Sequence, residues 1–407
     1  MIDGTSKCDN RPMHAPVPYS PPRPPIAVSP LIRDDVALAD IARADWNRLA
    51  HELPLLSHEY FTALHDTGCA TYETGWQPRF LTAWDRARLI GALPLYAKSH
   101  SYGEYVFDWG WADAYRRYGR RYYPKFVAAV PFTPVPGPRL LAGDKATRRA
   151  LLARALAELD RGYSSLHVLF TEDEQTREGA AAGMLVRDGL QFHWRNEGYR
   201  DFADFLAAFN HDKRKKIRQE RRRLRETGVT FVRKTGTDIT SADLAFFFEC
   251  YERTYHAHHS TPYLSLDFFD AIAESLAGRV LLVLGHRGGK RLCAALDVFD
   301  ERTLWGRYWG TREYVPGLHF ETCYYQAIDF CIERGLECFE GGAQGVHKLA
   351  RGLLPVATHS LHAIADRAFA SAIADYCARE RSDVAHSIGE LESGSPFRRD
   401  GSDGERT

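Results

Sequence analysis

Apolar positions along the chain follow two different periods, which predicts a protein of mixed helices and strands. Short apolar runs such as Ser165–Phe170 and Arg291–Phe299 are typical of buried strands. Apolar residues spaced three or four apart predict helices over Lys145–Asp160, Glu178–Asp188 and Asp201–Glu226. Because strands and helices follow one another throughout, the sequence predicts an α/β layer.

The predicted elements occur twice in nearly the same order. Each half has a hairpin of strands, a further strand, a loop rich in proline or glycine, a helix and then more strands. The two loops are Pro134–Pro138 and Val315–Gly317. We therefore expect two copies of one α/β unit, a first domain over 35–198 and a second over 199–380 that includes a long basic helix.

The two ends of the chain differ in composition from the part between them. Residues 1–34 are rich in proline, and residues 381–407 form a polar stretch after a last predicted helix, Phe369–Arg379. We expect both ends to be disordered tails. No apolar run approaches the ~20 residues of a membrane span. The N-terminus lacks a signal pattern, and the eight cysteines are scattered, so we expect a cytoplasmic protein with reduced thiols.

Charge is balanced over the whole chain but not along it. Lysine plus arginine and aspartate plus glutamate each number 53, yet Lys213–Glu226 carries nine cations and two acids. Such a helix either binds a polyanion, nucleic acid or a nucleotide diphosphate, or exposes a solvated face. The neutral total and the lack of interleaved aromatic residues argue against a general nucleic-acid binder.

The most unusual stretch is Leu336–Pro355, where a predicted strand is followed by a glycine-rich loop and a cluster of cations. Glycines let the backbone approach a ligand or adopt positive φ. The side chains around them offer a base, a neutral donor and cations: Glu340, Gln344, His347, Lys348 and Arg351. Because open α/β sheets place their sites at strand ends, we favour a functional site over a turn with solvated charges.

A second unusual stretch, Lys98–Asp113, mixes carboxylates with aromatic rings. Trp109 and Trp111 alternate as in a strand. Together with His100, the carboxylates of Glu104 and Asp108 beside the indole of Trp109 favour a pocket wall for a cationic or amine substrate. An equally good interpretation is that the aromatic rings of this stretch pack in the hydrophobic core and its carboxylates lie on the surface.

The histidines at 256, 258 and 259 have no acidic or cysteine partner at a suitable spacing. We therefore interpret them as loop residues and predict no metal site.

Several of these residues resemble the Fem-type branch of the GNAT acyltransferase superfamily. Members have a basic helix with an R-x-N-I-R core, a helix that ends in E-R-G-L, a strand that ends in acid-x-G, and then Y-K or H-K. The matching residues here are Arg214, Lys216, Ile217 and Arg218, then Glu333–Leu336, then Glu340, Gly342, His347 and Lys348. Lys98–Trp109 and Gly342–Gly352 are similar to runs in bacterial proteins described as predicted N-acyltransferases.

This resemblance implies a fold of two tandem GNAT-like domains, each a mixed, mostly antiparallel sheet flanked by helices. It also implies transfer of an acyl group from an activated donor, acyl-CoA or an acyl carrier protein, to a small-molecule or peptide amine without a covalent enzyme intermediate. Such a reaction needs a base, a donor for the oxyanion and a cationic cradle for phosphate.

The roles that follow from the resemblance are hypotheses. Glu340 or Asp108 is the expected base, and Lys348 with His347, or strand backbone near Tyr308, is expected to stabilise the oxyanion. The residues expected to contact substrate are His100, Glu104, Trp109, Tyr308, Gln344 and Arg351. The groups expected to contact phosphate are Arg214, Lys215, Arg218 and the helix N-termini at His319 or Asp144.

Two other functions stay open. The first is an aminoacyl-tRNA-dependent ligase of the peptidoglycan type, and the second is a binding protein that has the fold without the activity. For the protein as an enzyme we expect no tightly bound cofactor, with acyl-CoA or aminoacyl-tRNA acting as a co-substrate.

Overall fold

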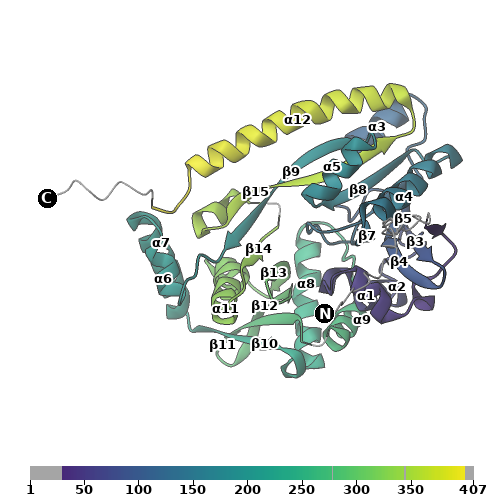
Figure 1. Ribbon diagram of the computed structural model, residues 1–407. Helices are drawn as coiled ribbons and strands as arrows, with labels where there is room; N and C mark the ends of the chain where they lie inside the picture. The colour runs from purple at the N-terminus through teal and green to yellow at the C-terminus, as the bar shows by residue number, and fades with distance from the viewer. Residues whose placement is uncertain (1–29, 277, 343–344, 399–407) are drawn as a thin grey trace, which may run out of the picture.

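The computed structural model describes residues 30–276, 278–342 and 345–398, and these build two β-sheets flanked by helices (Figure 1). The larger sheet has eleven strands, mostly antiparallel. In spatial order they are β10 (Val229–Thr235), β11 (Val280–Arg287), β12 (Lys290–Phe299), β13 (Thr303–Thr311), β14 (Cys338–Glu340), β9 (Leu185–Arg195), β15 (Leu354–Ile364), β8 (Ser165–Thr171), β6 (Lys125–Ala128), β5 (Leu95–Lys98) and β2 (Trp76–Pro78).

The smaller sheet, of order β1-β3-β4-β7, lies in the first half of the chain. Its strands are β1 (Leu31–Arg33), β3 (Leu81–Asp85), β4 (Arg88–Leu93) and β7 (Leu141–Ala142). The α-helices are α1 (Arg43–Leu49), α2 (His58–Asp66), α3 (Trp109–Arg117), α4 (Lys145–Leu156), α5 (Asp173–Ala181), α6 (Phe202–Ala207), α7 (His211–Glu226), α8 (Ser241–Ala257), α9 (Leu266–Ser275), α10 (Leu318–Phe320), α11 (Gln326–Arg334) and α12 (Arg367–Ser393). Shorter helical turns are η1 (Leu38–Asp40), η2 (Pro54–Leu56), η3 (Ala157–Arg161), η4 (Gly236–Asp238), the π-helical η5 (Glu321–Tyr325) and η6 (Val346–Arg351).

The two halves of the chain share one sheet and interleave at its centre. Each half contributes one parallel pair, β6 with β8 and β13 with β14, among antiparallel neighbours. β15, from the second half, lies between β8 and β9 of the first half, and β9 also pairs with β14. The repeated order predicted from the sequence is therefore present. However, the last strand of each half, β9 or β15, lies between two strands of the other half.

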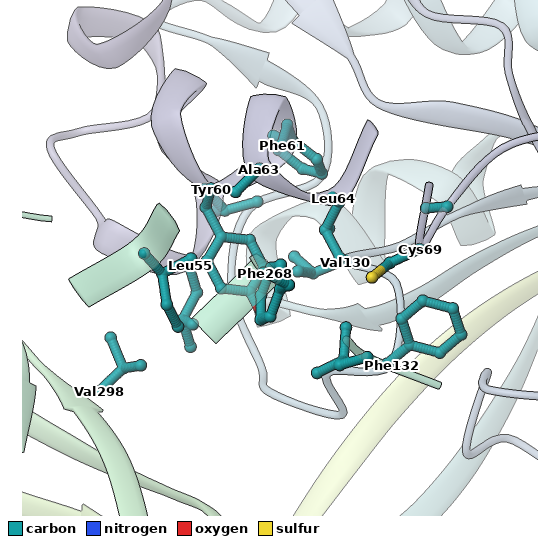
Figure 2. Packing of buried hydrophobic residues seen from close by; sticks show 14 of the residues in the cluster. Leu55, Tyr60, Phe61, Ala63, Leu64, Cys69, Val130, Phe132, Phe268 and Val298 are labelled. Atoms are coloured by element: carbon teal, nitrogen blue, oxygen red, sulfur yellow. The ribbon is translucent and has the colours of Figure 1, made fainter. Parts of the chain in front are cut away.

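A large hydrophobic cluster joins the halves on one face of the sheet (Figure 2). Leu55 and Tyr60, before and within α2, pack in it with Phe268 of α9 and Val298 of β12. The rings of Tyr60 and Phe268 meet edge to face at 5.5 Å between centroids, a geometry that aromatic pairs favour. Such shared packing makes independent movement of the halves costly.

Two predicted helices have other boundaries in the structure. The predicted helix Glu178–Asp188 is wrong in its second part, because α5 ends at Ala181 and β9, which begins at Leu185, pairs with β15. The long helix predicted over Asp201–Glu226 is two helices. Asn210 lies between them, and its side chain accepts a hydrogen bond from the Lys213 amide as an N-cap.

Two further differences between prediction and structure concern a helix that was predicted as a strand and a helix that is longer than predicted. Trp109 and Trp111 belong to α3 and not to a strand, with Trp111 buried and Trp109 40% exposed. The last helix continues past Arg379 to Ser393 as α12, which packs over β9 and β15 along the outer side of the sheet (Figure 1). The chain then forms a bridge between Phe397 and Phe209. Tertiary packing thus orders a segment whose composition alone indicates a tail.

One close contact predicts a strong destabilisation. A Cβ added at Gly310 of β13 would overlap the carbonyl of Cys250 in α8. We expect Gly310→Ala to lower the free energy of unfolding by about 2 kcal/mol or more, because backbone cannot yield as a side chain can. Urea unfolding measures this, with Gly143→Ala, which meets nothing within 4 Å, as the control. Equal midpoints for the two variants would contradict the packing of α8 on β13.

Every cysteine among the described residues is unpaired. The described helices include none that combines the length and the apolar character needed to cross a membrane.

Candidate functional site

The candidate site lies where β13 and β14 stop pairing. Their parallel register runs from Thr303 opposite Cys338 to Trp305 opposite Glu340. β14 ends there, while β13 continues to Thr311. Beyond this point an opening separates the two strands, so a ligand can reach backbone groups that would otherwise be paired.

Glu340 is the last residue of β14, and the register places it between Trp305 of β13 and His193 of β9. Side chains in register on neighbouring strands lie on the same face. Glu340 Oε2 is buried and has no hydrogen-bond partner among the described residues. Burial raises the pKa of Glu340 to about 8, although Arg195 and Arg307 oppose this rise. A carboxyl group with such a pKa can accept a proton near neutral pH.

His193 is held in one orientation beside Glu340. The amide nitrogen of Gln191 donates to the carbonyl oxygen of Pro134 at 2.7 Å, so its oxygen accepts from His193 Nε2 at 3.2 Å. Burial lowers the pKa of His193 to about 3, which keeps the ring neutral. One ligand atom each from His193, Cys338 and Glu340 lies within 4.8 Å of the others. Residue types of this kind hold zinc in other proteins.

The loop after Glu340 brings a lysine back to the strand end. Gly342 and Gly345 have φ of 76° and 102°, which glycine adopts without strain. Lys348 in η6 is 6% exposed, and its ammonium group donates to the carbonyl oxygen of Gly342 at 3.2 Å. Burial lowers the pKa of Lys348 to about 8. The sequence prediction that Glu340 and Lys348 lie near one strand end is consistent with these contacts; Gln344 lies outside the described residues.

A cavity of about 140 Å³ occupies the opening between the strands, on the face covered by η5. Its walls come from β12, β13, the strand end of β14 and the start of the following helices: Ala295, Asp297, Gly306, Arg307, Tyr308, Trp309, His319, Cys323, Tyr324, Phe339 and Gly341. Two residues predicted from the sequence, Tyr308 and His319, therefore line it. Glu340 does not, because strand alternation turns its side chain to the other face, where Trp305 and His193 lie.

Two charged residues, Asp297 and Arg307, also line this cavity, and neither was predicted from the sequence. The strand register shifts between Leu296 and Asp297, so that Arg307 is an extra residue on β13. Bulges of this kind re-aim side chains next to sites. The freed backbone N–H of Arg307 donates to Asp297 Oδ1 at 3.3 Å, while its guanidinium donates to the carbonyl of Phe132 at 2.6 Å. The feature of the sequence that could have indicated this part of the site is the aspartate inside the predicted strand Arg291–Phe299.

His347 and Arg351 take part in contacts that tie η6 to its surroundings. His347 is exposed, and its ring shares a hydrogen bond of 3.2 Å with the hydroxyl of Tyr324. Arg351 is 5% exposed, lies 3.3 Å over the ring of Phe320 and pairs with Glu220 of α7 at 3.1 Å. Arg351 thus connects the loop to α7, and some of the N–H donors of its guanidinium are already used in this contact.

α7 presents its cations mainly to solvent. Lys215 and Arg218 are exposed and Arg214 is partly exposed, and none of the three forms an ion pair within the described part of the chain. Arg221, by contrast, is paired with Glu321 at 2.7 Å. α7 therefore has one anchored face and one free cationic face.

The first-half residues proposed for substrate form a separate, buried cluster. Glu104 and Asp108 are 4% and 3% exposed, and both pair with the ammonium group of Lys125, Glu104 at 2.8 Å. Burial by itself would raise the pKa of Asp108, but the charge of Lys125 lowers it to about 2. Lys125 thus occupies the place expected for a cationic ligand, and Asp108 is a strongly acidic group and not a proton acceptor near neutral pH.

The two other residues of this stretch lie at its rim. His100 shares a hydrogen bond of 3.0 Å with the carbonyl of Thr74, and Trp109 meets the ring of Tyr102 at 4.8 Å.

Replacing the buried ammonium should unfold this region. We expect Lys125→Met to lower the free energy of unfolding by about 3 kcal/mol or more, because two buried carboxylates lose their partner. Urea unfolding at neutral pH provides the value, and Lys145→Met, at an exposed lysine, provides the control. If Lys125→Met were as stable as its control, the carboxylates would not depend on this lysine.

Comparisons with known proteins agree with this architecture. Among solved structures, FemX is 12% identical, with a TM-score of 0.51 over 80% of this chain and 96% of FemX. A tandem GNAT protein from the clavulanic acid biosynthesis pathway is 11% identical, with a TM-score of 0.42 over 83% of this chain and 98% of that chain. No curated protein sequence matches. The fold is thus similar to that of FemX.

A family model covers most of the chain. The FemAB-like model, described as peptidoglycan biosynthesis/recognition, matches residues 37–399. This range includes both halves, the β13–β14 opening, the glycine loop and α7. The chain therefore belongs to the FemAB-like family.

Proposed function

We propose that the protein is a cytoplasmic transferase that moves an acyl group from an activated donor, acyl-CoA or an acyl carrier protein, to an amine acceptor. The observation that carries this proposal is the carboxyl group of Glu340, with its pKa raised to about 8, at the end of β14 where the parallel strands part. Family membership favours a peptide or peptidoglycan precursor as the acceptor.

The proposed reaction uses both faces of the opening. The donor carbonyl lies between β13 and β14, and the amine approaches Glu340 from the face shared with the first half. Glu340 takes the proton from the amine as the carbon–nitrogen bond forms. The ammonium group of Lys348 stabilises the oxyanion until the leaving group departs.

A second function, transfer of an aminoacyl group from tRNA, is favoured by the free cationic face of α7. Arg214, Lys215 and Arg218 have no carboxylate partner in the described part of the structure, and phosphates would supply one. Binding of tRNA through such contacts would weaken steeply with added salt.

One assay separates the two functions. The purified protein is incubated with a set of amines and peptidoglycan peptides, and either thiol release from acetyl-CoA or consumption of labelled alanyl-tRNA is followed. Release of CoA that depends on the amine supports the first function, and consumption of alanyl-tRNA supports the second. If neither assay gave a signal, and native mass spectrometry of the protein from its own host showed neither a bound thioester nor tRNA, both proposed functions would be wrong.

The proposed base also excludes a metal-bound role for Glu340. A carboxylate that binds zinc together with His193 and Cys338 could not accept a proton as readily. We therefore expect transfer to be unchanged by EDTA, measured as the initial rate before and after dialysis. A loss of rate that zinc restores would replace the base by a metal centre.

A further inference from the structure

We propose that the 140 Å³ cavity between β12, β13 and η5 is a subsite for a small ammonium group, and that Asp297 is the residue that recognises it. This inference rests on the proposed transfer function, because the cavity lies on the donor side of the strand opening. It adds a requirement that the function alone does not contain, namely a positive charge on one of the two substrates besides the amine that reacts.

The first observation is an unsatisfied carboxylate oxygen. Asp297 is 2% exposed, and its Oδ2 has no hydrogen-bond partner in the parts of the chain that the structure describes. Its Oδ1 accepts only the long bond of 3.3 Å from the Arg307 amide. Leaving a buried charged oxygen without a partner is costly, and burial accordingly raises the pKa of Asp297 to about 7. An ammonium group bound in the cavity would supply the missing donor.

The second observation is the chemistry of the walls. Around Asp297 the cavity is lined by the aromatic rings of Trp309, His319 and Tyr324. The rings of Trp309 and His319 lie 4.5 Å apart. Burial lowers the pKa of His319 to about 4, so this ring is neutral at physiological pH. Neutral aromatic faces with one carboxylate favour a cation.

Arg307 is the one cation among these walls, and its geometry leaves room for a second. Its guanidinium donates to the carbonyl of Phe132 and, at 3.2 Å, to the hydroxyl of Tyr308. Arg307 reaches Asp297 through its backbone N–H, and among the described residues no ion pair joins its guanidinium to this carboxylate. Against the effect of burial, the charge of Arg307 lowers the pKa of Asp297 without a direct salt bridge.

The volume limits the ligand. A cavity of about 150 Å³ holds a six-membered ring, so 140 Å³ suits an amine of a few heavy atoms. Such a group is either the amino end of an aminoacyl donor or an amine of the acceptor other than the one that reacts. Both share the ammonium chemistry, and the test below separates them.

Binding is measured by calorimetry on the full-length protein, without turnover, so that the outcome does not depend on the proposed reaction. The probes are alanine methyl ester, its N-acetyl derivative and propylamine. We expect alanine methyl ester to bind wild type about 10- to 100-fold more tightly than the acetylated ester. Asp297→Asn should remove this preference, while Asp267→Asn, at an exposed aspartate of α9, should retain it.

The ranking of the two amines identifies the source of the ammonium group. Tighter binding of alanine methyl ester than of propylamine assigns the subsite to an aminoacyl donor, and the reverse assigns it to the acceptor. Equal binding of the free and acetylated esters by wild type would overturn the proposal. So would an unchanged preference in Asp297→Asn with a native circular dichroism spectrum. Either failure would leave the transfer function itself standing, because the rate assays above test it separately.

Discussion

Glu340→Gln is expected to lower kcat/KM for amide formation by about 10²- to 10⁴-fold, which is the usual contribution of a positioned base. The amide keeps the size of the side chain and its place between Trp305 and His193, but it cannot take a proton from the amine. The measurement is the initial rate of transfer with the donor identified by the thiol-release or tRNA assay.

Two controls separate this loss from misfolding. Glu337→Gln removes an exposed carboxylate that pairs with Arg302 at 2.7 Å, and we expect it to keep full activity. The second control is stability. Because the pKa of Glu340 is raised from 4.5 to about 8 by burial, wild type loses stability progressively as pH rises from about 4.5 to about 8. Glu340→Gln, which cannot ionise, should be at least as stable at pH 9. A stable variant with full activity would remove Glu340 from the mechanism.

Lys348→Ala is expected to lower kcat by about 10²- to 10³-fold, as the loss of one oxyanion donor does elsewhere. Lys348 is 6% exposed and donates only to the Gly342 carbonyl in the described structure, so its charge is directed into the strand end. We expect Lys348→Arg to restore part of the rate, because it keeps the positive charge.

The matched control for Lys348→Ala is Lys290→Ala at an exposed lysine of β12, which should keep the wild-type rate. The variants are compared in kcat and KM separately. An effect of Lys348→Ala on KM alone would mean that the lysine binds substrate in the ground state and not the oxyanion.

Much of the fold is readable from the sequence because its signals are local. Amphipathic periods and short apolar runs mark α4, β8 and β12 close to their observed bounds. Strand partners are not local. β15 lies between β8 and β9 of the other half, and no period in its own sequence indicates which strand it joins.

The residues of the candidate site also divide into those close together in the sequence and those brought together only by the fold. Glu340 and Lys348 stand close together in the sequence around a glycine loop, so their position near one strand end could be predicted. Asp297 and Arg307 come together only through a shift in the register of β12 and β13. Lys125 lies 17 positions from Asp108, and only the fold shows that it neutralises the carboxylates that the sequence assigned to a ligand.

The most direct test of the account is the pH dependence of single-turnover amide formation in wild type and Glu340→Gln. We predict that the wild-type rate rises about tenfold per pH unit below a bend near pH 8, where the carboxyl group of Glu340 titrates. The bend at this pH should be absent from the residual activity of the variant. If Glu340→Gln kept the same rate and the same bend, the group that accepts the proton would be another one, and the assignment of the site to the end of β14 would be wrong.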